Sequence, residues 1–137
     1  MEKTIKEIPD EQYFSLVIRN PIKHYKQLKS LLETLEKKKL VLFEITSHSL
    51  LKRGVDTILP YLESKNSTYS ELNLTINNTK HAVHVLLAIQ DRRSLTKVKI
   101  VTQQKIPNVV KDLVEDLVKE MHRKNYACGI SLKSTVE

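Results

Sequence analysis

The chain has 137 residues, 40% of them hydrophobic, and its 23 lysines and arginines exceed 16 aspartates and glutamates, so the formal net charge is +7. This length predicts one domain with a sizeable core, since a chain of this size buries roughly 68% of its unfolded surface. The basic balance favours a polyanionic partner such as nucleic acid or an acidic membrane surface. Cys128 is the only cysteine, which excludes an intrachain disulfide and a thiolate cluster and indicates a reducing intracellular setting.

The first half of the chain alternates strand and helix patterns. Asn20 is the expected cap of a helix opened by Pro21, and Thr46, Ser47 and Ser49 form the expected cap region of the next helix. In chain order we expect a flexible N-terminal tail at 1–11, a strand at 13–19, a helix from 21 to about 38, a strand at 40–45 and a helix from about 50 to 62. The continuous apolar run 40–45 is typical of a strand covered on both faces.

The second half begins with an alternating strand at 71–77 and a polar turn at 78–80. The apolar run 82–89 fits a helix or a strand, but its length, its β-branched residues and the preceding turn favour a buried strand, which would complete a hairpin. The remaining expected elements are a strand at 95–102, a helix opened by Pro107 with an apolar seam from 110 to 121, and a short apolar stretch at 126–132. No internal repeat is evident, so 12–137 is expected to be a single domain.

Two segments carry a resemblance to a known family. Arg19-Asn20-Pro21-Ile22-Lys23-His24-Tyr25 is similar to the basic strand end, helix-opening proline and following aromatic residue of the Alba superfamily. The segment from Thr46 to Thr57 is similar in spacing to that family's second signature, although the turn glycine is replaced here. Residues 82–87 resemble a late strand of the eukaryotic Alba-like subunits. The resemblance covers about 13–90 and leaves a C-terminal extension from about 95.

The resemblance implies an α/β fold with an Alba-like β-α-β-α-β-β sheet and two helices, followed by a C-terminal strand and an amphipathic helix. It implies a noncatalytic nucleic-acid-binding subunit that forms a homodimer or a heterodimer with another Alba-like chain. RNA is favoured over DNA, as in ribonuclease P and ribonuclease MRP, and the nucleus over the cytoplasm. The replaced glycine and the extra C-terminal elements look more like those specialised subunits than like the chromatin form. An Alba-type chromatin protein and a protein-interaction module with an incidental basic surface are the alternatives.

The candidate binding residues form two basic groups. Both expected strand-to-helix turns fall at the same edge of the sheet, where helix N-termini and basic side chains suit a phosphate. Between Arg92 and Lys111 there are six basic residues and no acid, and Lys97 and Lys99 share a strand face. The candidates are Arg19, Asn20, Lys23, Lys26, Ser47, His48, Lys52, Arg53, Arg92, Arg93, Lys97 and Lys99. Helix caps and solvated surface charge explain the same residues without a ligand.

Catalytic, cofactor and membrane functions are not expected. With two glycines the chain cannot supply a glycine-rich nucleotide loop, and Ser47-His48-Ser49 has no orienting carboxylate nearby in sequence. His81 and His84 lie three apart, on opposite faces of the expected strand, which disfavours a metal pair. No run approaches the roughly 18 apolar residues of a membrane span, and no signal peptide is evident. We therefore predict a soluble protein with no enzyme activity, no cofactor and no membrane partner.

Overall fold

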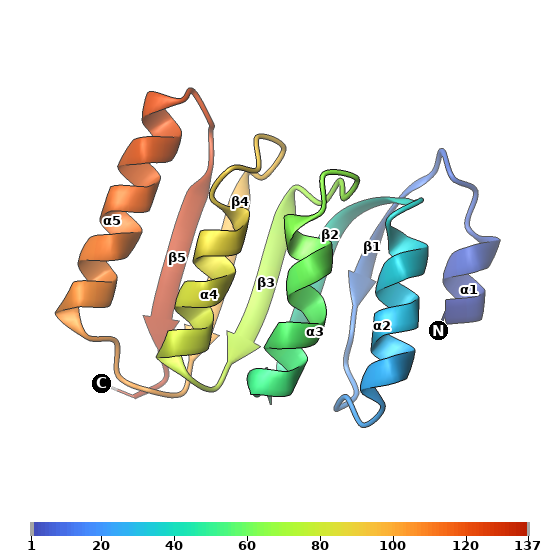
Figure 1. Cartoon of the computed structure of the whole chain (residues 1–137), viewed down its shortest axis with the longest axis horizontal. Helices are drawn as coiled ribbons and strands as arrows, with labels where there is room; N and C mark the ends of the chain where they lie inside the picture. Colours follow the sequence, from blue (N-terminus) through green and yellow to red (C-terminus); the bar gives the residue numbers. More distant parts are fainter. Residues whose placement is uncertain (1, 137) are drawn as a thin grey trace.

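The computed structural model describes residues 2–136, which form an α/β fold built on one five-stranded sheet. The strands are β1 (Tyr13–Val17), β2 (Lys39–Leu50), β3 (Glu71–Ile76), β4 (Lys97–Thr102) and β5 (Gly129–Ser134). The helices are α1 (Glu2–Glu7), α2 (Tyr25–Leu35), α3 (Lys52–Glu63), α4 (Thr79–Ile89) and α5 (Asn108–Arg123). All neighbouring strands are parallel, and their order in the sheet is their order in the chain (Figure 1).

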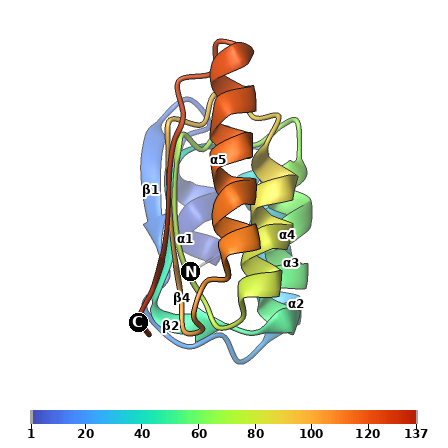
Figure 2. The same ribbon diagram turned by 90° about the vertical axis from the view of Figure 1, so that its left-hand side faces the viewer.

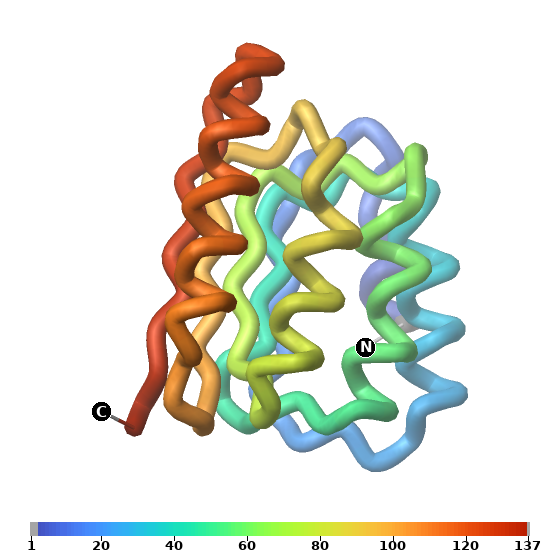
Figure 3. The backbone as a smooth tube through the Cα atoms, turned by 60° about the vertical axis from the view of Figure 1, so that its left-hand side comes forward, coloured from blue at the N-terminus to red at the C-terminus, as the bar shows by residue number. Residues whose placement is uncertain are grey.

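The helices α2 to α5 cover one face of this sheet only. Each returns the chain from the end of one strand to the start of the next, as parallel pairing requires. The side view in Figure 2 shows these helices on one side of the strands and no helix on the other. Register partners on adjacent strands are 26 to 32 positions apart, and the backbone trace in Figure 3 shows the resulting coil of strand-and-helix units. The molecule is therefore a short β/α solenoid.

A short sequence pattern recurs in the inner units of this solenoid. An apolar residue is followed three and five positions later by two more. The three inner units have Leu40, Phe43 and Ile45; Tyr69, Leu72 and Leu74; and Leu95, Val98 and Ile100. Each of these side chains is at most 1% exposed, and the last two of each unit pair in register across the sheet. The expectation of no internal repeat is therefore wrong, because spacing and burial repeat while the residues themselves change.

Strand β2 is covered by helices on one face, not on both as predicted. Leu40 and Phe43 face the core, whereas Leu42 and Glu44 on the other face are half-buried. The register with β1 shifts between Phe14 and Ser15, which pair with Leu40 and Leu42 and leave Val41 unmatched. This β-bulge explains why an apolar run that does not alternate forms a strand with one open face.

The run 82–89 belongs to helix α4, so the predicted hairpin and the Alba-like order of elements are wrong for the described residues. Its buried side chains have helical spacing and are Ala82, Val85, Leu86 and Ile89. Asn78 caps the helix because its side-chain oxygen accepts a hydrogen bond of 2.8 Å from the Lys80 backbone N–H. The residues predicted as a hairpin turn are thus a helix N-terminus.

The first two predicted helix starts are also displaced. Helix α2 begins at Tyr25, with His24 and not Asn20 at the capping position. Residues 46–49 continue β2, so α3 begins at Lys52 after Leu51. The later predictions are confirmed: 95–102 contains β4, and the helix after Pro107 is α5.

The segment before Gln12, expected as a tail, contains α1 and contributes to the core. Ile5 is 3% exposed, and α1 lies beside α2 at the β1 end of the sheet (Figure 1). The buried Lys38 ammonium donates to the Ile8 carbonyl oxygen at 2.6 Å and lies 2.7 Å from Asp10 Oδ1. The hydrogen bond from Lys38 holds the pKa of the Asp10 carboxyl below its usual value. This segment closes the β1 end of the solenoid.

Replacing Lys38 by Met should destabilise the β1 end of the solenoid. We expect the free energy of unfolding to fall by about 1–3 kcal/mol, because hydrogen bonds from a charged group are lost and the Ile8 carbonyl loses its donor. Urea denaturation monitored by circular dichroism measures this difference. The control is Lys37→Met, at an exposed neighbouring position, which should change stability by less than about 0.5 kcal/mol. Equal stability of the two variants would contradict the assigned role of Lys38.

Candidate functional site

The face of the sheet opposite the helices is not covered by any described helix. Its side chains alternate with the core residues and lie in rows across the strands. One row is Ser15, Leu42, Glu71, Lys97 and Gly129; the next is Val17, Glu44, Asn73, Lys99 and Ser131; a third contains Thr75, Val101 and Lys133. All of these residues are exposed or half-buried. We call this surface the open face.

The chemistry of the open face changes from strand to strand. Val17 and Leu42 make the side of β1 and β2 apolar, and the centre carries the carboxylates of Glu44 and Glu71. At the β4 and β5 side lie three exposed lysines, Lys97, Lys99 and Lys133, which we call the lysine patch. A partner with acidic groups at one end and apolar groups at the other fits this gradient.

Lys97 and Lys99 share a face, as their spacing predicts, but their surroundings differ from those expected. Glu71 is the register partner of Lys97, and Asn73 is that of Lys99. Asn73 Nδ2 in turn donates to Glu44 Oε1 at 2.9 Å. The segment 92–111 contains no acidic residue, but in the folded chain its lysines on β4 lie near the carboxylates of Glu71 and Glu44.

Sequence reasoning missed one member of the lysine patch. Lys133 pairs in register with Val101 and lies on the same face as Lys99. The stretch 126–132 was expected only as a short apolar segment. The alternation of polar and apolar residues in 129–134 would have identified the strand and the outward position of Lys133.

The turns after β1 and β2 lie together at the C-terminal ends of the strands, as predicted, because the strands are parallel. The Arg53 guanidinium lies 4.7 Å from the centroid of the Tyr25 ring, and Lys52 Nζ is 3.1 Å from Asp56 Oδ2. A groove of about 390 Å³ runs between α2 and α3. It is lined by Lys26, Lys29 and Arg53 together with Glu33, Glu36 and Asp56. Its charge is mixed rather than uniformly basic.

The polar residues expected at the helix starts have other positions. Ser47, on the extended β2, donates to the Arg19 carbonyl oxygen at 2.5 Å and lies 3.3 Å from His48 Nδ1. Asn20 and Lys23 line a separate hollow of about 540 Å³ near α1. Ser47 thus joins β2 to the turn after β1, and neither helix start has a side-chain cap.

Arg92 lies at the N-terminal ends of the strands, in the loop between α4 and β4. Its guanidinium donates to the carbonyl oxygens of Leu62, Ser64 and Ser67 and lies 4.7 Å from the Tyr69 ring centroid. Burial raises the pKa of the Tyr69 phenol well above its usual value. Arg92 therefore satisfies carbonyls at the end of α3 and joins neighbouring units. Arg92, a candidate binding residue in the sequence, therefore has a structural role.

The twelve predicted residues therefore occupy three places and do not form one surface. One set surrounds the turns after β1 and β2. Arg92 and Arg93 lie at the N-terminal ends of the strands, and the Arg93 guanidinium is 5.7 Å from the Tyr126 ring centroid. Lys97 and Lys99 lie on the open face, between the two ends of the strands.

The structure also bears on the predictions about metals and membranes. His81 and His84 are on helix α4, with ring centroids 6.2 Å apart, so their predicted opposite-face placement is wrong. In the described part of the chain, no group of three His, Cys, Asp or Glu side chains could hold a metal ion. Within residues 2–136 no helix is long and apolar enough to cross a membrane.

Comparisons of the chain with protein-family models, with curated proteins and with solved structures found no match. They identify no relationship to the Alba superfamily.

Replacing Arg92 by Met should destabilise the protein by about 2–4 kcal/mol, because the α3 carbonyls lose a charged donor. The matched control Arg93→Met removes an exposed guanidinium from the same loop and should cost less than about 1 kcal/mol. Urea denaturation of both variants checks the difference. If Arg93→Met were the more damaging change, the role given to Arg92 would be wrong.

Proposed function

We propose that this chain is a noncatalytic protein-binding module whose partner binds across the open face. The observation that carries the proposal is the one-sided helical cover, which leaves a five-stranded surface outside the core. The three inner strands of that surface, β2, β3 and β4, are held on their other side by fully buried residues. Solenoids in general use such extended surfaces to bind partners.

The repeat pattern supports the same proposal. Apolar residues at positions one, four and six of each inner unit are similar to the pattern of leucine-rich repeats, in which one strand and one helix stack per repeat. Unit β3 also has Asn77 at the ninth position, where that pattern has Asn or Cys. The similarity concerns architecture, and it favours a binding role over a catalytic one.

The composition of the open face supports a protein partner. Half-buried apolar side chains of Val17, Leu42 and Val101 lie among charged and amide groups, as in protein interfaces that combine apolar and polar contacts. The lysine patch suits an acidic segment of the partner, while Glu44 and Glu71 beside it disfavour a continuous polyanion.

Nucleic-acid binding is the second candidate function. The formal net charge of +7 and the three lysines on one face favour it. The narrower hypothesis of an Alba-like subunit of ribonuclease P or MRP, or of an Alba-type chromatin protein, loses the support of the predicted hairpin. RNA or DNA would then contact the lysine patch through phosphates.

The protein-binding proposal predicts that charge reversal on the open face abolishes partner capture. The test compares the tagged chain, the variant Lys97→Glu/Lys99→Glu/Lys133→Glu, and the charge-matched control Lys29→Glu/Lys111→Glu/Lys119→Glu on exposed helical positions. Each is incubated with nuclease-treated extract of the native source, and captured proteins are then titrated in purified form. We expect the open-face variant to bind at least ~10-fold more weakly than the wild type and the control. Equal affinity of all three forms would overturn the proposal.

The second candidate makes a different prediction. Fluorescence anisotropy with single-stranded RNA, structured RNA and duplex DNA should show binding at low salt that weakens with log[salt], with a slope of about −0.7 to −0.9 per phosphate contact. The variant Lys97→Ala/Lys99→Ala/Lys133→Ala should lower the magnitude of that slope by about 2–3. Absence of binding to all three probes at low salt would exclude this candidate.

A further inference from the structure

The two edges of the sheet differ in how they are protected. At the β1 edge, α1 and the Lys38 contacts close the end of the molecule, and the bulge beside Phe14 disturbs the ladder. At the other edge, β5 pairs with β4 alone and no further strand of the described residues pairs with it, while α5 lies past this edge in the helix layer (Figure 1). The β5 edge is therefore available to another strand.

The last unit leaves part of its core uncovered. Ile130 and Leu132 of β5 are half-buried, whereas their register partners Val98 and Ile100 are 1% and 0% exposed. On α5, Val109 is 73% exposed. Stacking of a further unit is what buries these positions elsewhere in the solenoid.

The hydrogen bonds of β5 show which backbone groups face outward. The N–H of Gly129 donates to Thr96 and that of Thr135 to Thr102, at 3.0 and 2.9 Å. Backbone groups alternate in direction along a strand, so residues 129, 131, 133 and 135 face β4. The N–H and C=O groups of Ile130 and Leu132 therefore point to the free edge.

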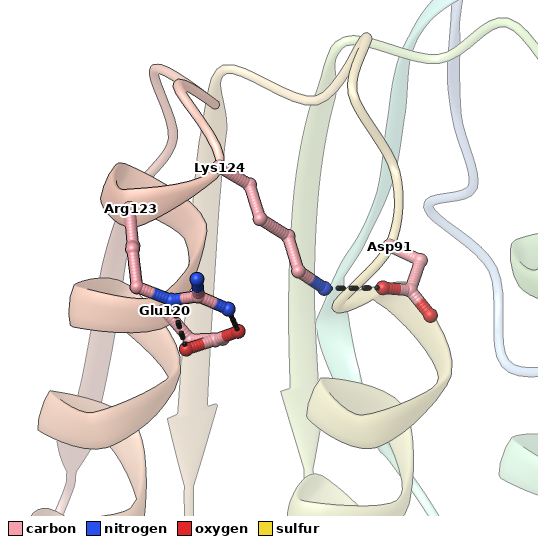
Figure 4. Close-up of polar contacts among 4 residues, drawn as sticks. All are labelled: Asp91, Glu120, Arg123 and Lys124. Atoms are coloured by element: carbon pink, nitrogen blue, oxygen red, sulfur yellow. Dashed lines mark hydrogen bonds and ion pairs between the residues drawn. The ribbon is translucent and has the colours of Figure 1, made fainter.

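The last unit is held in place by polar contacts, so this edge is a formed surface. Lys124 Nζ, after the end of α5, lies 3.1 Å from Oδ1 of Asp91 in the loop after α4 (Figure 4). The hydrogen bond to Asp91 raises the pKa of the Lys124 ammonium. Arg123 pairs with Glu120 within α5 (Figure 4). The Lys124–Asp91 contact joins the end of α5 to the preceding unit, whereas the Arg123–Glu120 pair lies within α5.

We propose that β5 pairs antiparallel with β5 of a second copy of this chain, with Ile130 opposite Leu132 and Ser131 opposite Ser131. In this register both outward-facing residues exchange N–H and C=O hydrogen bonds with their opposites. Apolar side chains meet on the helix side and serines on the open side. Lys133 faces Gly129, which has no side chain.

The strand is self-complementary in this register, and two kinds of alternative are disfavoured. A shift by one residue would oppose core-facing and solvent-facing side chains. A register that opposes Lys133 to Lys133 would place like charges together. Because the same strand is used twice, the interface is isologous and closes as a dimer. Head-to-tail pairing of β5 with β1 would instead form an open filament against the bulged, closed edge.

The dimer should respond to salt in a defined way. Two-fold pairing brings the lysine patches of both copies to the same side of one continuous sheet, on either side of the axis. Their repulsion opposes association and is screened by salt. We therefore expect the dimer to tighten as ionic strength rises. This inference does not rest on the proposed function, since it concerns the chain alone.

The first test is disulfide capture with Ser131→Cys. A residue opposite its own copy in a non-hydrogen-bonded pair has a Cα separation of about 4.5 Å, within the range that a disulfide spans. Under mild oxidation we expect a covalent dimer from Ser131→Cys and none from the control Ser15→Cys on the exposed open face of β1. The native Cys128 is 1% exposed and present in both variants. Equal or faster cross-linking of Ser15→Cys would overturn the assigned register.

The second test is analytical ultracentrifugation over a wide concentration range at low and high salt. The wild-type chain should form a dimer, Ser131→Lys should weaken it at least ~10-fold by adding like charge at the two-fold axis between the lysine patches, and the matched control Ser15→Lys should leave it unchanged. Ser131 is half-buried on the open face, outside the core, so the fold should be retained. A monomeric wild type at every concentration and salt, an equal effect of Ser15→Lys, or filaments would each overturn the proposal.

Discussion

The structure depends on one constraint: a strand-and-helix unit of this size cannot bury its apolar row by itself. The row of each unit is covered only by the rows of its neighbours and by helices that all lie on the same face. Phe43, Leu72 and Val98 are fully buried because they lie in adjacent units at equivalent positions. Two consequences follow from this stacking. One face of the sheet stays open, and the first and last units need a device that ends the stack.

Those two consequences define the surfaces on which function is proposed. On β2, β3 and β4 the residues of the open face alternate with buried core residues, so the core determines the arrangement of their charged and apolar groups. The β1 end is closed by α1 and by the buried ammonium of Lys38. The β5 end has no such device in the described residues, and Ile130 and Leu132 remain half-buried there. A binding face and a self-pairing edge are thus separate results of one architecture.

The basic residues divide between structure and surface in a way that net charge does not reveal. Lys38 and Arg92 are both committed to backbone carbonyls, one at the first unit and one between inner units. Lys52 is paired with Asp56. The lysine patch, by contrast, is exposed and unites residues from two strands. The net charge therefore overestimates the number of basic groups that a polyanion could contact, because some of them are bonded to backbone carbonyls within the fold.

The sequence by itself determined the α/β class, the helix after Pro107 and the shared face of Lys97 and Lys99, because those features depend on local periodicity. It also contained the repeat, in the spacing of Leu72 and Leu74 and of Val98 and Ile100, although the changing residues concealed it. Only the tertiary structure decided that 82–89 is a helix, because an apolar run of that length satisfies either pattern until its neighbours bury it. It also decided that Arg92 is structural, that Lys133 joins Lys99, and that Glu71 lies beside Lys97, since these relations connect residues that are distant in the chain.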